Sequence, residues 1–378
     1  MNQIQKLTVK GFKSIKTLDA FELRPMNVLI GANGAGKSNF IGLFRFLASV
    51  VGDNFAVEVQ KWGGPEALLH YGSKETPKMD LEIQFSPNMG FNESFKNGYH
   101  VTLEATQDNR LIFSCEEPMV HGGSYNFPKV YSLGAGHDSA RIRIDRDSPS
   151  AKVSRYVLDK LQIWRQYHFH DTGDTAAVKR IHPINDNLRL KPNAANLAAY
   201  LRKLKKNPMH ESSYDRIVET IQRAAPFFGD FVFRDEVSEF IELEWTERGR
   251  PDTPWKAHVL SDGTLRFICL TTLLLQPQAL LPDTILIDEP ELGLHPFAIN
   301  LLAEMLKEAA QSKQVIVSTQ SVELLNNFQP EDVVVVQREG DASLFKRLNS
   351  AELADWLTED YSLGELWKRN VLGGRPTR

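Results

Sequence analysis

The sequence has little of the features that would place it in a special structural class. Only two cysteines, Cys115 and Cys269, occur in 378 residues, and they lie far apart in apolar or strand-like surroundings. This usage argues against a disulfide framework and favours reduced packing residues. No apolar run approaches the ~18 residues that a membrane-spanning helix needs, and the opening Met-Asn-Gln does not resemble a signal peptide. We therefore expect a cytoplasmic protein without a membrane partner.

The sequence also lacks a surplus of charge of one sign. The formal net charge is −4 at pH 7 and the isoelectric point is about 6.2. This argues weakly against nucleic-acid binding over the whole surface, but it leaves room for a local basic groove. The hydrophobic (42%) and charged (24%) fractions are those of an ordinary globular chain. Its length allows one large domain or a few small ones.

A glycine-rich stretch near the N-terminus carries the clearest chemistry. Residues 31–38 read Gly-Ala-Asn-Gly-Ala-Gly-Lys-Ser and match the pattern G-x-x-x-x-G-K-[ST]. An apolar run at 27–30 predicts a strand before it, and apolar residues at helical spacing in 39–51 predict a helix after it. Glycines let backbone N–H groups turn around a phosphate chain, and the helix N-terminus adds positive charge. The pattern predicts a nucleoside-triphosphate site rather than an unliganded turn.

The loop supplies a set of candidate nucleotide-binding residues. These are Gly31, Ala32, Asn33, Gly34, Ala35, Gly36, Lys37, Ser38 and Asn39. Lys37 is expected to reach the β- and γ-phosphates, and Ser38 to offer its hydroxyl to Mg²⁺. Lys13 lies in a predicted turn between strands at 4–9 and 18–23. It lies either near the nucleotide or, as a lone exposed lysine, in solvent.

An added antiparallel lobe is predicted after the loop's helix. Alternating runs at 79–85, 99–105 and 111–116 are separated by Gly, Asn, Asp or Pro, which is typical of short strands. The sequence Arg-Ile-Arg-Ile-Asp-Arg at 141–146 is expected to close this lobe as a further strand. Asp-Ser-Pro-Ser at 147–150 is the best linker candidate in the chain.

From residue 151 to about 226 the pattern becomes helical and basic. The basic residues are Arg155, Lys160, Arg165, Arg202, Lys203, Lys205 and Lys206. They form either a solvated helix face or a surface for the phosphate backbone of nucleic acid, whose binding would depend on salt. His168 and His170 would share a face on an extended segment. No second ligand pair accompanies them, so we favour a packed polar cluster or a loop beside the nucleotide over a zinc site.

Two further motifs lie in the last third of the chain. Leu-Ser-Asp-Gly-Thr at 260–264 opens a strongly apolar helix, where free N–H groups suit an anion, although Ser-Asp-Gly is also an ordinary helix start. A buried strand at 284–287 then delivers Asp288 and Glu289 at its C-terminal tip. Asp288 is expected to hold Mg²⁺, and Glu289 to polarise the attacking water. Alternating strands and helices over 259–336 predict a doubly wound sheet.

Taken in order, these motifs resemble those of ATP-binding-cassette (ABC) ATPases of the RecF, SMC and OLD kind. The carrying segments are the phosphate loop, Leu-Ser-Asp-Gly-Thr, and Asp-Glu-Pro-Glu-Leu-Gly-Leu-His-Pro at 288–296. Lys-Gly-Phe-Lys-Ser-Ile at 10–15 is similar to that group's first hairpin. The whole chain resembles a bacterial group of compact AAA/ABC-type ATPases. Some relatives in that group are implicated in phage defence and DNA repair.

The resemblance implies an α/β fold of the P-loop NTPase class. It would be an ABC-type ATPase head with a mixed-sheet core, an antiparallel β lobe and an inserted helical lobe. Residues 1–147 would form the N-terminal part of the ATPase domain, 148–255 the inserted, mainly helical lobe, and 256–378 the C-terminal part.

The resemblance also implies a homodimer that sandwiches ATP. In this superfamily a signature turn, which corresponds here to Leu-Ser-Asp-Gly-Thr at 260–264, caps the γ-phosphate held by a partner subunit. Ser261 and Gly263, with Asp262 between them, would then touch the partner's ATP. Lys37, Ser38, Asp288 and Glu289 would act on the ATP of their own subunit, with Mg²⁺.

The chain departs from the family pattern in three respects. Asp262 and Thr264 stand where transporters carry Gly and Gln. Gln320 occupies the switch position where His is frequent. It can hydrogen-bond a phosphate or water but cannot carry a proton, so we expect slow turnover, with Gln320 joining Lys37 and Glu289 as a catalytic residue. No glutamine of the Q-loop is clearly assigned. Gln166 is the candidate, and with that role it would be a Mg²⁺ ligand.

Two functional classes remain open. Residues 150–255 are too few for an SMC-like arm and lack a Cys-x-x-Cys hook, and the tail after Val336 is too short for an OLD-type nuclease domain. The protein is therefore expected to be an ATP-gated dimeric clamp on DNA that uses the basic helical lobe. The alternative is a regulatory ATPase that restrains a separate effector protein in a defence or toxin system. A membrane-transporter subunit is disfavoured by the large antiparallel insertion.

Overall fold

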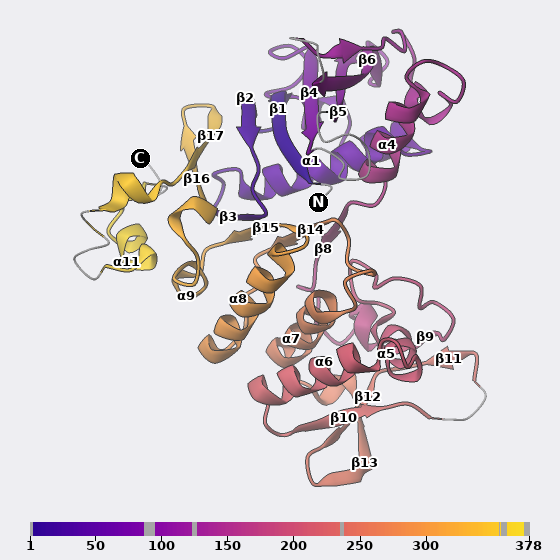
Figure 1. Cartoon of the computed structure of the whole chain (residues 1–378), viewed down its shortest axis with the longest axis vertical. Helices are drawn as coiled ribbons and strands as arrows, with labels where there is room; N and C mark the ends of the chain where they lie inside the picture. The colour runs from indigo at the N-terminus through magenta and orange to yellow at the C-terminus, as the bar shows by residue number, and fades with distance from the viewer. Residues whose placement is uncertain are drawn as a thin grey trace. The chain divides into compact units, whose positions relative to one another are not determined.

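A computed structural model describes residues 3–86, 95–122, 127–234, 238–354, 356 and 361–373 (Figure 1). The chain is divided into two compact packing units. Unit 1 contains Met1–Arg165 and Gln329–Arg378, and unit 2 contains Gln166–Phe328. The division into 1–147, 148–255 and 256–378 stays a prediction.

An antiparallel sheet forms much of unit 1. Its strands, in sheet order, are β2 (Ile15–Glu22), β1 (Ile4–Phe12), β4 (Lys78–Phe85), β5 (Phe95–Ala105), β6 (Leu111–Gly122) and β7 (Lys129–Val130). Met79, Leu81 and Ile83 of β4 are buried, whereas the residues between them are half-buried, as expected for a sheet with one core-facing side. The strands predicted at 79–85, 99–105 and 111–116 are confirmed.

Helices cover the buried face of this sheet. They are α1 (Lys37–Val50), α2 (Phe55–Lys61) and α4 (Ala151–Leu161). Unit 1 also contains α3 (Pro65–Leu68), and α11 (Leu363–Lys368) lies in the C-terminal tail. The rings of Phe46 in α1 and Phe12 in β1 have centroids 5.4 Å apart. Helix α4 packs on β5 and β6 (Figure 1). The helix predicted after the phosphate loop is therefore present and packed on the sheet.

The prediction of a strand at 141–146 is wrong. Residues Arg141–Arg143 form a 3-10 helix instead. The cause is the buried carboxylate of Glu116, which accepts hydrogen bonds from the backbone N–H groups of Arg141 (2.8 Å) and Ile142 (2.9 Å). Its carboxylate also accepts from the hydroxyl of Tyr99 at 2.9 Å. A buried carboxyl group needs hydrogen-bond partners, and these bonds to Glu116 take the segment away from strand pairing.

A second strand set in unit 1 carries the phosphate loop. Strand β3 (Met26–Ile30) is fully buried and runs parallel to β16 (Val333–Glu339), which pairs antiparallel with β17 (Ala342–Arg347). The valine run at 333–336 is therefore a buried strand, as predicted. The end of β3 leads directly into residues 31–38.

Unit 2 is mainly helical, with short strands. Its helices are α5 (Leu197–Lys206), α6 (Glu211–Ala224), α7 (Asp262–Leu275), α8 (Pro296–Ala310) and α9 (Val322–Leu325). Its strands are β9 (His182–Pro183), β10 (Phe228–Val232), β11 (Phe240–Ile241), β12 (Glu244–Glu247), β13 (Arg250–Lys256), β14 (Thr284–Asp288) and β15 (Gln314–Thr319), and β8 (Arg165–Tyr167) lies at its start. Helices α6, α7 and α8 lie side by side (Figure 1). Among the residues described, no helix is both long and apolar enough to cross a bilayer.

Candidate functional site

The phosphate loop has the backbone that its sequence predicts. Gly34 and Gly36 have positive φ angles of 77° and 116°, and α1 begins immediately afterwards at Lys37. A Cβ atom at Gly36 would lie 2.2 Å from the hydroxyl oxygen of Ser343, so no larger residue fits. The N-terminus of this 14-residue helix carries no side-chain cap. Its first N–H groups are thus suited to an anion.

A network of serine hydroxyl groups holds the loop in place, and no local sequence pattern predicts it. The Ser343 hydroxyl in β17 is buried, donates to the carbonyl of Ala35 (2.5 Å), and lies 2.8 Å from Ser14 Oγ. The side chain of Asn39 in α1 donates to the same Ser14 oxygen at 2.8 Å. The hairpin turn and β17 therefore hold the loop and its helix in one arrangement.

The predicted phosphate-binding side chains take two different environments. The Lys37 ammonium is buried and donates to the carbonyls of Gly31 (2.7 Å) and Ala32 (3.1 Å), so it lies across the loop. Ser38 is exposed at the second position of α1. Its hydroxyl oxygen is a donor type that Mg²⁺ prefers.

Lys13 lies beside the loop's helix and is half-buried. Its ammonium is 4.4 Å from the ring centroid of Trp62, and burial, followed by repulsion from Arg45, lowers its pKa. A hollow of about 340 Å³ lies here. Its lining residues are Lys13, Ser14, Asn39, Leu69, Tyr71 and Arg338. Lys13 is therefore not a fully exposed lysine, and its place near the nucleotide stays a prediction.

The predicted acidic strand tip is present in unit 2. The residues of β14 are buried up to Asp288, and β14 runs parallel to β15 with Asp288 opposite Ser318. The Ser318 hydroxyl donates to the Asp288 carboxylate. Glu289 follows with a φ of 44°, unusual for a non-glycine residue, and its N–H donates to the Ser318 carbonyl at 2.9 Å. Strained backbone of this kind is frequent at functional sites.

Gln320 is hydrogen-bonded to Glu289, the predicted catalytic base. Its side-chain amide donates to the Glu289 carboxylate. Glu291, which the sequence reasoning did not single out, accepts from the Thr319 hydroxyl (2.6 Å) and from the Gln320 N–H (3.2 Å). Burial raises the pKa of Glu291. Glu291 thus ties the end of β15 to the turn after β14 and fixes the backbone that carries Gln320.

The signature turn is the exposed start of α7. Ser261 is the N-cap, and its hydroxyl oxygen accepts from the Thr264 N–H at 3.2 Å. Ser261 and Asp262 are exposed, and Lys179 approaches Asp262 with its ammonium 4.0 Å from the carboxylate. A Cβ at Gly263 would lie 2.4 Å from the Gly293 carbonyl oxygen. Glycine is therefore required for close packing against the turn after the acidic strand.

Arg266 is a structural residue that the sequence reasoning missed. Its guanidinium is buried and donates to the carbonyls of Phe169 and His170, both at 3.0 Å, and to that of Leu292. This explains the backbone around His168 and His170, whose rings lie 6.3 Å apart. A single arginine within an otherwise apolar helix was the available signal. Gln166 lies in β8, and its proposed metal role stays a prediction.

The basic residues of the region predicted to be helical, 151–226, are divided between the two packing units. Arg155 and Lys160 belong to α4 in unit 1, whereas Lys203, Lys205 and Lys206 belong to α5 in unit 2. Lys205 is paired with Asp230 at 2.7 Å. Charge on α5 is therefore partly neutralised within unit 2.

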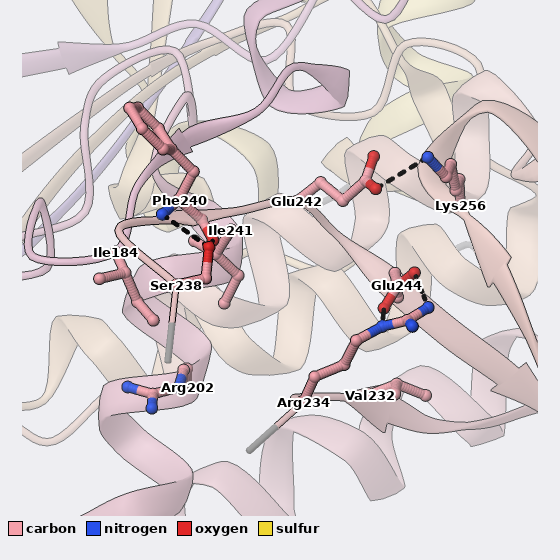
Figure 2. A pocket seen from close by; sticks show the side chains of 10 residues that line it. All are labelled: Ile184, Arg202, Val232, Arg234, Ser238, Phe240, Ile241, Glu242, Glu244 and Lys256. Atoms are coloured by element: carbon pink, nitrogen blue, oxygen red, sulfur yellow. Dashed lines mark hydrogen bonds and ion pairs between the residues drawn. The ribbon is translucent and has the colours of Figure 1, made fainter. Parts of the chain in front are cut away.

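Arg202 of α5 differs from these lysines because it lines a pocket of about 330 Å³ (Figure 2). In this pocket Arg234 pairs with Glu244, and Lys256 pairs with Glu242. Within the part of the chain that the structure describes, the buried Nε of Arg202 has no hydrogen-bond partner.

The fold is similar to that of SMC ATPase heads. One solved SMC head, bound to the C-terminal winged-helix domain of ScpA, has a TM-score of 0.60 at 17% identity, covering 93% of this chain and 99% of that one. A second, from Pyrococcus furiosus, has a TM-score of 0.57 at 14% identity, covering 95% and 100%. The fold is therefore that of an SMC-type ATPase head, a P-loop NTPase fold with a mixed α/β architecture, as predicted.

The chain belongs to the AAA_21 family, described as "AAA domain, putative AbiEii toxin, Type IV TA system", whose match spans residues 26–326. Two curated relatives match shorter segments. A putative ABC transporter ATP-binding protein of Methanosarcina acetivorans is 33% identical over 101 residues, which are 26% of this chain and 33% of that protein. The structural maintenance of chromosomes protein 3 of Arabidopsis thaliana is 39% identical over 72 residues, 18% of this chain and 6% of that protein. The matches therefore span a third or less of these relatives.

Proposed function

We propose that this protein is a Mg²⁺-dependent ATPase that dimerises head to head around two ATP molecules and acts on DNA in repair or genome maintenance. ATPase chemistry is the property of its family, and the rest is our inference. The observation that carries the dimer is the signature turn. Ser261 and Asp262 are exposed at the start of a 14-residue helix, a position from which a partner's phosphate is accessible. Such a clamp would work in the cytoplasm, where ATP and DNA are both present.

The proposed chemistry assigns a task to each motif. Lys37 would hold the phosphates, and Glu289 would orient and polarise the attacking water. The oxygen donors of Ser38 and Asp288 fit the ligand preference of Mg²⁺, and Ser318 holds the Asp288 carboxylate in place. When bound, Mg²⁺ would neutralise phosphate charge. Because the dimer would depend on the γ-phosphate, hydrolysis would release the clamp.

The test is the oligomeric state of the purified chain with and without ATP and DNA. We expect a monomer-to-dimer change with ATP, and DNA binding that requires ATP and weakens with salt. Reversing Lys203 and Lys206 to glutamate should weaken DNA binding and leave dimerisation unchanged. The matched control reverses Arg180 and Lys307, exposed cations elsewhere in unit 2, and should bind DNA normally. A dimer that ignores DNA in all these variants would contradict the DNA-clamp function.

That outcome would favour a second candidate function. The family description names a toxin of a type IV toxin–antitoxin system, and one similar SMC head is bound to another protein, ScpA. These names support a regulatory ATPase of a defence or toxin system that controls a separate effector. Co-purification of this chain with a neighbouring gene's product, without dependence on DNA, would support this candidate.

Gln320 gives a prediction about catalysis. Its amide donates to the Glu289 carboxylate, so it would orient the base. Gln320→Ala should lower the ATP hydrolysis rate roughly tenfold, because a hydrogen bond to a charged group contributes about 1.5 kcal/mol. ATP affinity should not change. Gln311→Ala, on an exposed site at the end of α8, is the control. Hydrolysis at the wild-type rate in Gln320→Ala would show that this residue has no part in catalysis.

A further inference from the structure

Three neighbouring strands of unit 1 place metal-binding side chains on one face of a sheet. In the register of β4, β5 and β6, Asp80 lies opposite Thr102, which lies opposite Cys115. Two residues away along β5 and β6, His100 lies opposite Glu117. Residues directly opposite one another share a face of the sheet. The other face carries buried residues such as Leu81 and Val101, so this cluster lies on the side away from the helices.

The ligand atoms of three of these residues converge. His100 Nδ1 lies 3.2 Å from a Glu117 carboxylate oxygen and 3.9 Å from the Cys115 sulfur. One ligand atom from each of His100, Cys115 and Glu117 lies within 4.8 Å of the others. In a tetrahedral zinc site, bond lengths of about 2.0 Å to nitrogen and 2.3 Å to sulfur place these two atoms about 3.5 Å apart. The observed spacing needs only small side-chain rotations.

The second imidazole nitrogen is already held from outside the cluster. His100 Nε2 lies 2.9 Å from an Asp80 carboxylate oxygen, and that oxygen accepts from the Thr102 hydroxyl at 3.0 Å. Histidines that bind metals usually donate their other N–H to a carboxylate or carbonyl, which fixes the tautomer and the ring orientation. Asp80 would therefore leave Nδ1 as the nitrogen directed at Cys115 and Glu117.

We propose that His100, Cys115 and Glu117 bind a zinc-class divalent ion, with Asp80 orienting the imidazole and the fourth position open to water. The sulfur, nitrogen and single carboxylate favour Zn²⁺ over Mg²⁺ or Ca²⁺, which prefer oxygen ligands alone. The side chains of His100 and Glu117 are 22% and 26% exposed, so an ion can enter from solvent. The site is separate in sequence from the nucleotide motifs, and it does not rest on the proposed ATPase cycle.

The competing arrangement is an imidazolium ion between two carboxylates. Hydrogen bonding to Asp80, and then to Glu117, raises the pKa of His100 to about 9. In that state Nδ1 carries a proton and the thiol has no ligand role. Metal binding would replace the Nδ1 proton and the thiol proton, and both would be released to solvent. The two arrangements therefore differ in whether the Cys115 sulfur is bonded to a metal ion.

Titration of the reduced, nucleotide-free and chelator-treated full chain with Co²⁺ tests the site. A four-coordinate cobalt ion bound by a thiolate gives a charge-transfer band in the near ultraviolet and strong ligand-field bands in the visible. We expect both bands, saturating at one ion per chain, and we expect Zn²⁺ to displace the cobalt. Zn²⁺ should also raise the midpoint of thermal unfolding.

Four variants distinguish the site from adventitious binding. Cys115→Ser should remove the charge-transfer band and the thermal shift, and His100→Asn should weaken binding to the same ion. Asp80→Ala should weaken it by about 10- to 100-fold while the charge-transfer band remains at saturation, because Asp80 acts through His100. Cys269→Ala, which changes the buried cysteine of α7, should keep every signal. Absence of the bands in the wild-type chain, or a band that survives Cys115→Ser, would overturn the proposal.

Discussion

Glu289→Gln should trap the ATP-bound dimer. The amide keeps the size and hydrogen bonding of the side chain but cannot accept a proton, and a general base typically contributes 100-fold or more to a rate. ATP hydrolysis should therefore fall by at least about 100-fold, with ATP affinity unchanged. On a sizing column with ATP and Mg²⁺, the variant should elute at twice the mass of the nucleotide-free chain.

A matched control separates the base from a general effect of lost charge. Glu323→Gln makes the same change on an exposed residue of α9 in the same unit. It should hydrolyse ATP at the wild-type rate. A Glu289→Gln protein that binds ATP yet stays monomeric would show that the sandwich mechanism is wrong here. Wild-type hydrolysis in that variant would show that Glu289 is not the base.

Ser261→Asp should strongly weaken ATP-dependent dimerisation without damage to the fold. Aspartate is as good an N-cap as serine, so α7 keeps the cap that Ser261 now supplies to the Thr264 N–H. A carboxylate facing the partner's γ-phosphate would be repelled, and such like-charge contacts cost several kcal/mol. We expect dimer affinity in Ser261→Asp/Glu289→Gln to fall by at least about 100-fold relative to Glu289→Gln alone.

The neutral variant Ser261→Asn controls for shape. It has nearly the same size as aspartate and also caps helices well, so it should retain most of the dimerisation. ATP binding to the phosphate loop of the same chain should be equal in both variants, as measured with a fluorescent nucleotide. Equal dimerisation in the aspartate and asparagine variants would show that the turn does not face a phosphate.

The sequence predicts local structure correctly where one short segment carries the whole signal. The phosphate loop needs glycines at fixed offsets between a buried strand and a helix, and all of these lie within 26–50. The same holds for β14, whose apolar run ends in Asp288. The prediction failed at 141–146, because the alternation there is overridden by the buried Glu116, 25 residues earlier in the chain. A local sequence pattern cannot show which distant carboxylate will accept hydrogen bonds from a segment's N–H groups.

By itself, the sequence determined the nucleotide loop, the acidic strand tip, the capped signature helix and the class of fold, because each depends on residues that are neighbours in the chain. Only the tertiary structure showed that Ser343 holds the loop at Ala35 and contacts Ser14, 329 residues away, and that Arg266 binds the carbonyls of two distant segments. Only strand register placed His100 beside Cys115 and Glu117. The physical reason is the same in each case. These contacts depend on how separate segments pack, and spacing along the chain does not encode that.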